Sequence, residues 1–260
     1  MTPAPVRAAM HTDQGRIRSR NEDACLVDAD LGLFAVADGM GGHPAGDVAA
    51  RVAIEHLPRL VGRALDGIDR GADAGGVGAA VEEAVLALNE VVIAEASADP
   101  GRTGMGTTLV LALISGRTAH VAHAGDSRAY LLREDRLRRL TEDHSLAAAL
   151  VDGGVLDAEQ AARHPFAQSL TQAIGMPGTR PEIHRVQLAA GDRLLLCSDG
   201  LTKMLPEERI AALLAAGQDT GPTSRALVDA ANDAGGHDNV SVVLIDVLPE
   251  GAAEAGGHPG

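Results

Sequence analysis

The first half of the chain alternates between short apolar runs and longer segments with helical periodicity. Apolar residues predict strands at 6–12, 23–28 and 31–37, the last two joined by a tight hairpin. Beyond a glycine-rich loop, apolar residues recur every three or four positions in two segments. This spacing predicts amphipathic helices at about 48–61 and 81–92.

The second half begins as a run of hairpins between positions 107 and 140, after which helical and strand-like patterns alternate. Helices are expected at 145–162, with an interruption at 152–154, at 206–216 and at 223–234; strands are expected at 186–188, 193–197 and 240–247. This order does not fit a strictly alternating parallel fold. It favours an α+β fold in which antiparallel sheets are covered by helix pairs.

No internal repeat or break in composition divides the chain, so residues 1–248 are expected to form one domain. The tail at 249–260, rich in Gly, Ala and Glu, is expected to be flexible. Apolar residues make up 45% of the 260 positions, enough for a substantial core. Cys25 and Cys197 show no metal-binding spacing and are interpreted as reduced thiols.

The net charge of −14 argues against non-specific binding to nucleic acid or to an anionic membrane, because both are negative. Aromatic residues, at 1%, are too few to provide a stacking platform for single-stranded nucleic acid. The N-terminus lacks a signal-peptide pattern, and no apolar run approaches the roughly 20 residues of a membrane span. These features predict a cytoplasmic protein.

Four carboxylates share one position in the pattern, the junction between an apolar strand and a glycine-containing turn: Asp38, Asp126, Asp199 and Asp238. A carboxylate beside a buried strand costs free energy unless a cation neutralises it. Each one alone is compatible with an ordinary turn. Four such carboxylates in one chain predict a common site that binds a cluster of divalent ions. Ligands that are all oxygen favour Mg²⁺ or Mn²⁺ over zinc.

Seven short motifs follow one another in an order that resembles the metal-dependent protein phosphatases of type 2C, in their bacterial branch. They are Arg18–Asp23, Val36–His43, Met105–Thr108, Gly125–Arg128, Asp143–Ser145, Ser198–Leu201 and Asp238–Val240. The resemblance covers nearly the whole chain. It implies an α-β-β-α sandwich of two antiparallel sheets flanked by helix pairs, with a binuclear Mn²⁺ or Mg²⁺ centre at one edge.

The resemblance also implies a role for each matched residue. Asp38 would bridge two metal ions, of which the carbonyl of Gly39 would hold one, and Asp199 and Asp238 would complete the other. Glu22 would act through metal-bound water, and Asp126 with Asp199 matches a third, weaker metal position.

The remaining matched residues would act on the substrate. Arg18 would grip the phosphate, Asp23 would orient Arg18, and His43 would be the general acid. The segment from about 145 to 177 would form a mobile flap beside the site. The implied activity is hydrolysis of phosphoserine and phosphothreonine in proteins, with bacterial serine/threonine kinases and their substrates as partners.

Other classes of protein fit the sequence less well. A nucleotide-dependent transferase with a phosphate-binding loop needs a lysine after a glycine-rich loop, and the only lysine, Lys203, has none before it. No twelve-residue run alternates acidic ligands as a calcium-binding loop does. Two alternatives stay open: a phosphatase-like binding protein without catalysis, and a metal-dependent phosphodiesterase acting on a nucleotide.

Overall fold

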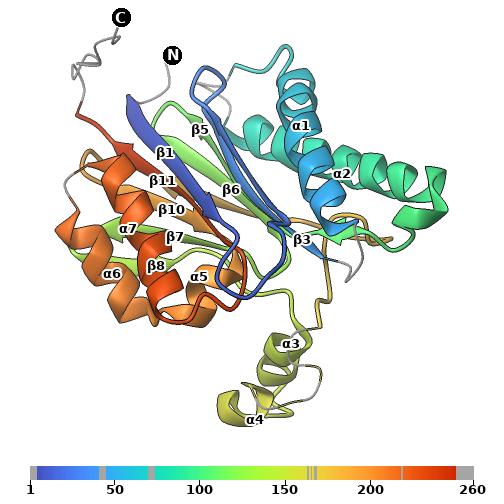
Figure 1. Ribbon diagram of the computed structural model, residues 1–260. Helices are drawn as coiled ribbons and strands as arrows, with labels where there is room; N and C mark the ends of the chain where they lie inside the picture. The colour runs from blue at the N-terminus through green and yellow to red at the C-terminus, as the bar shows by residue number, and fades with distance from the viewer. Residues whose placement is uncertain are drawn as a thin grey trace, which may run out of the picture.

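A computed structural model describes residues 5–40, 45–69, 74–162, 164, 166, 169–217 and 219–249. Two antiparallel sheets are stacked face to face, with helices outside each (Figure 1). The first sheet has the order β1 (Val6–Asp13), β11 (Val240–Val247), β10 (Arg193–Cys197), β7 (Arg128–Arg133), β8 (Arg136–Arg139). The second has the order β2 (Asp23–Asp28), β3 (Leu33–Met40), β5 (Leu109–Ser115), β6 (Thr118–Ala124), β9 (Glu182–Gln187), and β4 (Gly106–Thr107) pairs with β3.

Helices cover the outer faces of both sheets. The second sheet carries α1 (Gly46–Ala64) and α2 (Ala74–Ala98), while α5 (Asp199–Met204), α6 (Glu207–Ala216) and α7 (Thr220–Asp233) lie against the first. This arrangement confirms the predicted α-β-β-α sandwich.

The alternation of side chains along β3 explains how one strand serves two cores. Leu33 and Ala35 point outward and pack with the apolar faces of α1 and α2. Phe34 and Val36 point the other way, into the core between the sheets. Successive side chains of a strand face opposite sides, so a strand covered on both faces reads as a continuous apolar run.

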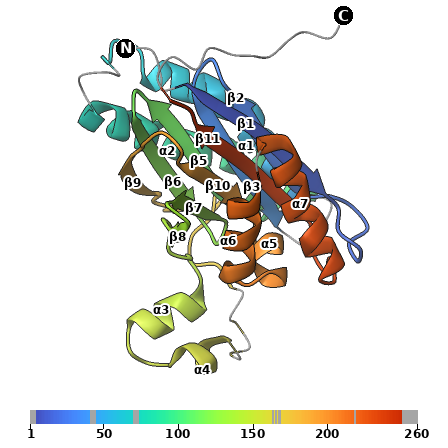
Figure 2. The same ribbon diagram turned by 90° about the vertical axis from the view of Figure 1, so that its left-hand side faces the viewer.

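One segment lies apart from this layered body. Helices α3 (Leu146–Asp152) and α4 (Ala158–Ala162) project away from the sandwich, as the two views agree (Figures 1 and 2). The expected interruption of this helical segment at 152–154 is present: α3 ends at Asp152, and Gly154 has a positive φ of 65°. The tail from 250 onward lies outside the described residues.

Several elements were not predicted. They are the short strand β4, a 3₁₀ turn at Pro100–Arg102, and α5, while β8 lies within the predicted run of hairpins without having been predicted as a separate strand. Strand β9 begins at Glu182, four residues before the predicted start at 186. Across the described ranges, no helix combines the length and the apolarity needed to cross a bilayer. Both cysteines are free thiols; Cys197 is buried, as expected of both, whereas Cys25 is only partly buried.

Candidate active site

The pairing of β2 with β3 sets one side of the site. Asp23 lies directly opposite Asp38 in this ladder, and the N–H of Asp38 donates to Thr108 Oγ1 at 3.0 Å. Beyond Asp38 the strand continues to Met40, so Asp38 does not end it as the sequence suggested. The cause is β4, which pairs Gly39 with Thr107 and extends the ladder.

Gly39 brings three pieces of chain together. Its N–H donates to the carbonyl of Glu22 at 3.1 Å, and a Cβ at this position would lie 2.1 Å from the carbonyl oxygen of Gly46, the first residue of α1. Only glycine permits so close an approach. Glu22 is therefore held beside Asp38 and the start of α1.

The other sheet supplies the opposite side of the site. Asp199 follows β10 and Asp238 comes shortly before β11, and these two strands are neighbours. The sequence indicated a turn at Asp199. The structure instead begins α5 there, which is favourable because an acidic residue in the first turn complements the helix dipole.

The side chain of Asn239 joins the two sides. Its amide oxygen accepts from the N–H of Glu22 at 2.9 Å, and its amide nitrogen donates to the carbonyls of Gln14 and Arg20 at 2.8 and 2.9 Å. The loop that carries Arg18 is thus tied to the residue next to Asp238. Asn239 was part of a recognised motif, but no positioning role was predicted for it.

The predicted ligands meet in one cavity of about 270 Å³. It is lined by Arg18, Glu22, Asp38, Gly39, Met40, Thr108, Asp126, Leu170, Asp199, Lys203, Asp238 and Asn239. All six residues expected to hold metal are in this lining. Asp23 is partly buried and does not line the cavity, and His43 lies outside the described residues.

Burial and mutual repulsion dominate the electrostatics of these acids. Burial, together with the charges of Asp23, Asp199 and Asp126, raises the pKa of Asp38 well above its usual value. Burial likewise raises the pKa of Asp23 and of Asp126 to about 7, with the charge of Asp199 adding to both shifts. Carboxylates packed this closely are costly to ionise without a cation between them.

Two carboxylate oxygens without hydrogen-bond partners also indicate that the site needs a cation. Within the described part of the chain, Asp23 Oδ1 and Asp199 Oδ1 are buried without a hydrogen-bond partner. Buried polar atoms are normally paired, so each exception calls for an explanation. A set of carboxylate oxygens with a backbone carbonyl close by suits Mg²⁺ or Mn²⁺, and the residues present therefore fit a hard divalent ion.

Two cationic side chains lie among these acids. Arg18 makes a bidentate ion pair with Asp238: Nε lies 2.9 Å from Oδ1, and Nη2 lies 2.9 Å from Oδ2. Lys203 pairs with Asp199, and its Nζ lies 3.6 Å from Asp238 Oδ2. Lys203 was not predicted as a site residue. The sequence feature that could have indicated Lys203 is its spacing of four residues from Asp199, which places both side chains on one face of a helix.

The structure does not pair Asp23 with Arg18, so the orienting role of Asp23 stays a prediction. Arg18 meets Asp238 instead, while Asp23 Oδ2 accepts from Ser198 Oγ at 2.9 Å. The reason is the strand geometry, because the pleat that places Asp23 opposite Asp38 turns its side chain into the interior between the sheets. Asp23 links the β2 edge to the end of β10.

The segment that carries α3 and α4 contacts the cavity at the point where it joins the sandwich. Ser145 and Leu170 form an isolated β-bridge, and Leu170 lines the cavity. The N–H of Thr171 donates to the carbonyl of His144 at 2.8 Å. The two ends of the segment are therefore held together beside the acids, while α3 and α4 extend outward.

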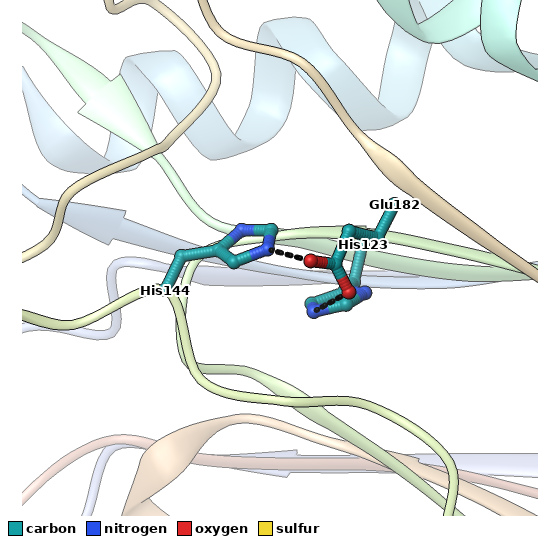
Figure 3. A group of neighbouring side chains, drawn as sticks. All are labelled: His123, His144 and Glu182. Carbon is teal, nitrogen blue, oxygen red and sulfur yellow. Dashed lines mark ion pairs between the residues drawn. The ribbon is translucent and has the colours of Figure 1, made fainter. Parts of the chain in front are cut away.

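A histidine cluster braces the loop that carries Asp126. Figure 3 shows His123, His144 and Glu182 directed toward one another, with 3.4 Å between His144 Nε2 and Glu182 Oε1. The three lie close enough to share a metal ion, and among the described residues His144 Nε2 has no hydrogen-bond partner. His123 Nε2 lies 2.7 Å from the carbonyl oxygen of Glu142, and the N–H of Gly125 donates to His144 Nδ1 at 3.3 Å.

That hydrogen bond fixes the tautomer of a neutral His144. With Nδ1 accepting, the proton lies on Nε2 and faces Glu182. Through its hydrogen bond with the N–H of Gly125, His144 braces the loop that carries Asp126.

The chain is similar to known proteins along nearly its whole length. The family model described as protein phosphatase 2C matches residues 9–231. The serine/threonine protein phosphatase PstP of Mycobacterium tuberculosis is 37% identical over 243 residues, which cover 94% of this chain and 45% of that protein. The chain thus spans about half the length of PstP. The serine/threonine phosphatase stp of Listeria innocua is 36% identical, covering 93% of this chain and 96% of the relative.

Solved structures agree in fold. One, described as the catalytic domain of PstP in complex with two manganese ions, has 35% identity and a TM-score of 0.78, covering 94% of this chain and 99% of that one. Another, the serine/threonine phosphatase Stp1 of Staphylococcus aureus, has 29% identity and a TM-score of 0.85, covering 95% and 97%. By its sequence and by the architecture around the acidic cavity, this chain belongs to the protein phosphatase 2C family.

Proposed function

We propose that this protein is a metal-dependent protein serine/threonine phosphatase. The observation that carries the proposal is the convergence of Glu22, Asp38, Asp126, Asp199 and Asp238 on one cavity beside an arginine. Five acids in so small a space need cations, and the family to which the chain belongs includes a member described with two manganese ions.

The proposed ligands are divided between two ions of Mn²⁺ or Mg²⁺. Asp38 would bridge them, the carbonyl of Gly39 would bind one, and Asp199 and Asp238 would complete the other. Glu22 would bind through water, and Asp126 with Asp199 marks a weaker third position. When bound, such ions supply a water molecule of lowered pKa and neutralise charge on a phosphate.

The side chains of the chain itself would bind the substrate and move protons. A guanidinium presents a planar fork that fits two phosphate oxygens, which a lysine cannot match. Arg18 is about half exposed, and its present partner, Asp238, is a proposed metal ligand. A cation on Asp238 would weaken that ion pair and leave Arg18 available to phosphate. His43 would protonate the departing serine or threonine oxygen.

The substrates are proposed to be phosphorylated proteins in the cytoplasm, including serine/threonine kinases and their targets. Residues 1–248 would act as a single domain in which the segment from 145 to 177 is a mobile flap. The position of Leu170 in the cavity lining supports a role for this segment at the substrate entrance.

The test is release of phosphate from a phosphothreonine peptide with and without Mn²⁺. We expect turnover that EDTA abolishes and that added Mn²⁺ restores. A phosphotyrosine peptide and a phosphodiester, bis(p-nitrophenyl) phosphate, run in parallel should be poorer substrates. Faster hydrolysis of the diester would favour the phosphodiesterase alternative. Peptide binding without any release of phosphate would favour a binding protein.

A further inference from the structure

Two imidazole rings and one carboxylate lie together at the β9 edge of the second sheet (Figure 3). His123 of β6 and Glu182 of β9 are direct partners in the antiparallel ladder, so both side chains project from the same face. His144 joins them from the loop that precedes α3. One ligand atom from each of these three residues lies within 4.8 Å of the other two. None of the three lines the acidic cavity, so the group is a separate site.

The backbone holds His144 in this position. Its N–H donates to the carbonyl of Gly125 at 3.0 Å, and its carbonyl accepts from the N–H of Thr171 at 2.8 Å. The side chain is only 8% exposed, and its Nε2 is directed toward Glu182 without a hydrogen-bond partner among the described residues. Buried polar atoms are normally paired, so this nitrogen calls for an explanation, which a bound ion would provide.

The ring of His123 is already oriented as a ligand. Its Nε2 lies 2.7 Å from the carbonyl oxygen of Glu142, so this nitrogen carries the proton and donates it. Histidines that bind metal commonly donate their other N–H in this way. The remaining nitrogen, Nδ1, is buried and has no hydrogen-bond partner in the described part of the chain. Burial also lowers the pKa of His123 to about 4, so the ring is neutral at neutral pH and its lone pair is free.

Glu182 supplies a negative charge and a route of entry. Burial raises the pKa of its carboxyl group, but His144, His123 and His184 outweigh burial and lower it, so the group is ionised at neutral pH. The side chain is 45% exposed, and an ion from solution can therefore reach it. His184 Nε2 also lies near this carboxylate, 3.5 Å from Oε2.

We propose that His123, His144 and Glu182 form a second metal site, which takes a transition ion that favours imidazole, such as Zn²⁺. Two histidines and one glutamate are a donor set that holds zinc in proteins, with a fourth position left to water. Zinc lies about 2.0–2.2 Å from such ligands, so the ligand atoms around one tetrahedral ion are roughly 3.5 Å apart. The three side chains reach that spacing by small rotations from separations of at most 4.8 Å. The acidic cavity, whose ligands are oxygens, suits Mn²⁺ or Mg²⁺ instead.

Binding at His144 has a consequence for the loop that carries Asp126. An ion on Nε2 leaves the proton of the neutral ring on Nδ1, which then cannot accept from the N–H of Gly125. At 3.3 Å that hydrogen bond is longer than usual, so little is lost when the ion replaces it. Occupation of the site should therefore be visible at the Gly125 amide.

The test is a titration with Zn²⁺ in excess Mg²⁺, which occupies oxygen ligands but has little affinity for imidazole. Calorimetry measures binding, and nitrogen NMR follows the histidine rings. The native protein should bind one Zn²⁺ that shifts the ring signals of His123 and His144 and the amide signal of Gly125. Zn²⁺ that binds without shifting the two ring signals, or that does not bind, would overturn the inference.

Two variants each remove one ligand. Glu182→Gln and His144→Gln should weaken Zn²⁺ binding at least about tenfold, because even the groups that support metal ligands are worth 10–100-fold in affinity. Urea unfolding checks that both fold, and the half-exposed position of Glu182 makes E182Q the safer of the two. His56→Gln, on α1, is the matched control and should bind as the native protein does. Equal affinity of E182Q and the native protein would contradict the site. The inference does not depend on the proposed phosphatase activity, because none of the three ligands lines the acidic cavity.

Discussion

Gly200 lies directly against the backbone of Asn239, so closely that a Cβ on Gly200 would come within 1.9 Å of the Asn239 carbonyl oxygen. The sequence neighbours of these two residues are Asp199 and Asp238. Contact between the two backbones therefore holds the two acids side by side, where β10 and β11 meet the cavity.

Replacing Gly200 by Ala should separate these segments. The methyl group has no space against a backbone atom, and overpacking of this kind typically costs about 1–3 kcal/mol. We expect a lower midpoint of urea unfolding and weaker Mn²⁺ binding. Gly62→Ala is the matched control, because a Cβ there meets nothing within 4 Å and it lies inside α1, where alanine is favoured by up to about 1 kcal/mol. Equal midpoints for the two variants would contradict the steric role of Gly200.

Asp38→Asn should reduce turnover by orders of magnitude. Asp38 is the proposed bridge between two ions, and an amide cannot supply the negative charge that holds both. The measurement is kcat as a function of Mn²⁺ concentration, with binding followed by calorimetry. Near-normal activity at low Mn²⁺ would remove Asp38 from the bridging role.

The metal-free protein should become less stable as the pH rises, in part through Asp126. Its pKa is about 7 in the folded chain and about 3.9 when unfolded. Between these values the folded chain holds more protons, so the free energy of unfolding falls with increasing pH, by up to about 1.4 kcal/mol per pH unit.

Asparagine at position 126 removes this titration. In the presence of chelator, the stability of Asp126→Asn relative to the native protein should therefore increase from pH 5 to pH 8, as measured by urea unfolding at each pH. A constant difference would show that Asp126 is already ionised at pH 5. In saturating Mn²⁺ the native protein should be more stable than Asp126→Asn, because the native carboxylate then has a cation beside it.

His43→Ala should distinguish substrates by their leaving groups. A serine or threonine alkoxide is a strong base and needs a proton, whereas p-nitrophenolate hardly does. General acid catalysis is worth roughly 10²–10⁴ in rate. We expect a loss of that size on a phosphothreonine peptide and a much smaller one on p-nitrophenyl phosphate, measured as kcat. Equal losses on the two substrates would exclude His43 as the acid.

Periodicity predicted most of the fold because the elements are long and their apolar faces are regular. The segments at 6–12, 240–247 and 206–216 all correspond to elements with nearly the same bounds. The short elements escaped prediction for a physical reason. A six-residue helix such as α5, or a two-residue strand such as β4, is too short for a period to emerge and is stabilised by its tertiary neighbours.

Four acids of the site, Asp38, Asp126, Asp199 and Asp238, were predictable because each breaks the apolar pattern at a strand junction, whereas Glu22 was predicted only from the family resemblance. The contacts made by the residues around these acids were not predictable. The partner of Arg18 and the position of Lys203 depend on how two sheets stack. The family resemblance assigned Asp23 to Arg18, whereas in the structure its side chain accepts from Ser198. Register and stacking are long-range properties that local patterns do not encode.

The acids come from both layers of the sandwich: Asp38 from the sheet under α1, and Asp199 and Asp238 from the sheet under α7. In the proposed arrangement Asp38 joins the ion held by Gly39 to the ion held by Asp199 and Asp238, so the pair of ions needs both layers. A chain in which the layers have not yet closed, or have begun to part, would thus be unable to hydrolyse phosphate esters. Bound metal would in turn stabilise the contact between the layers, so that the protein would become active only when its folding is complete.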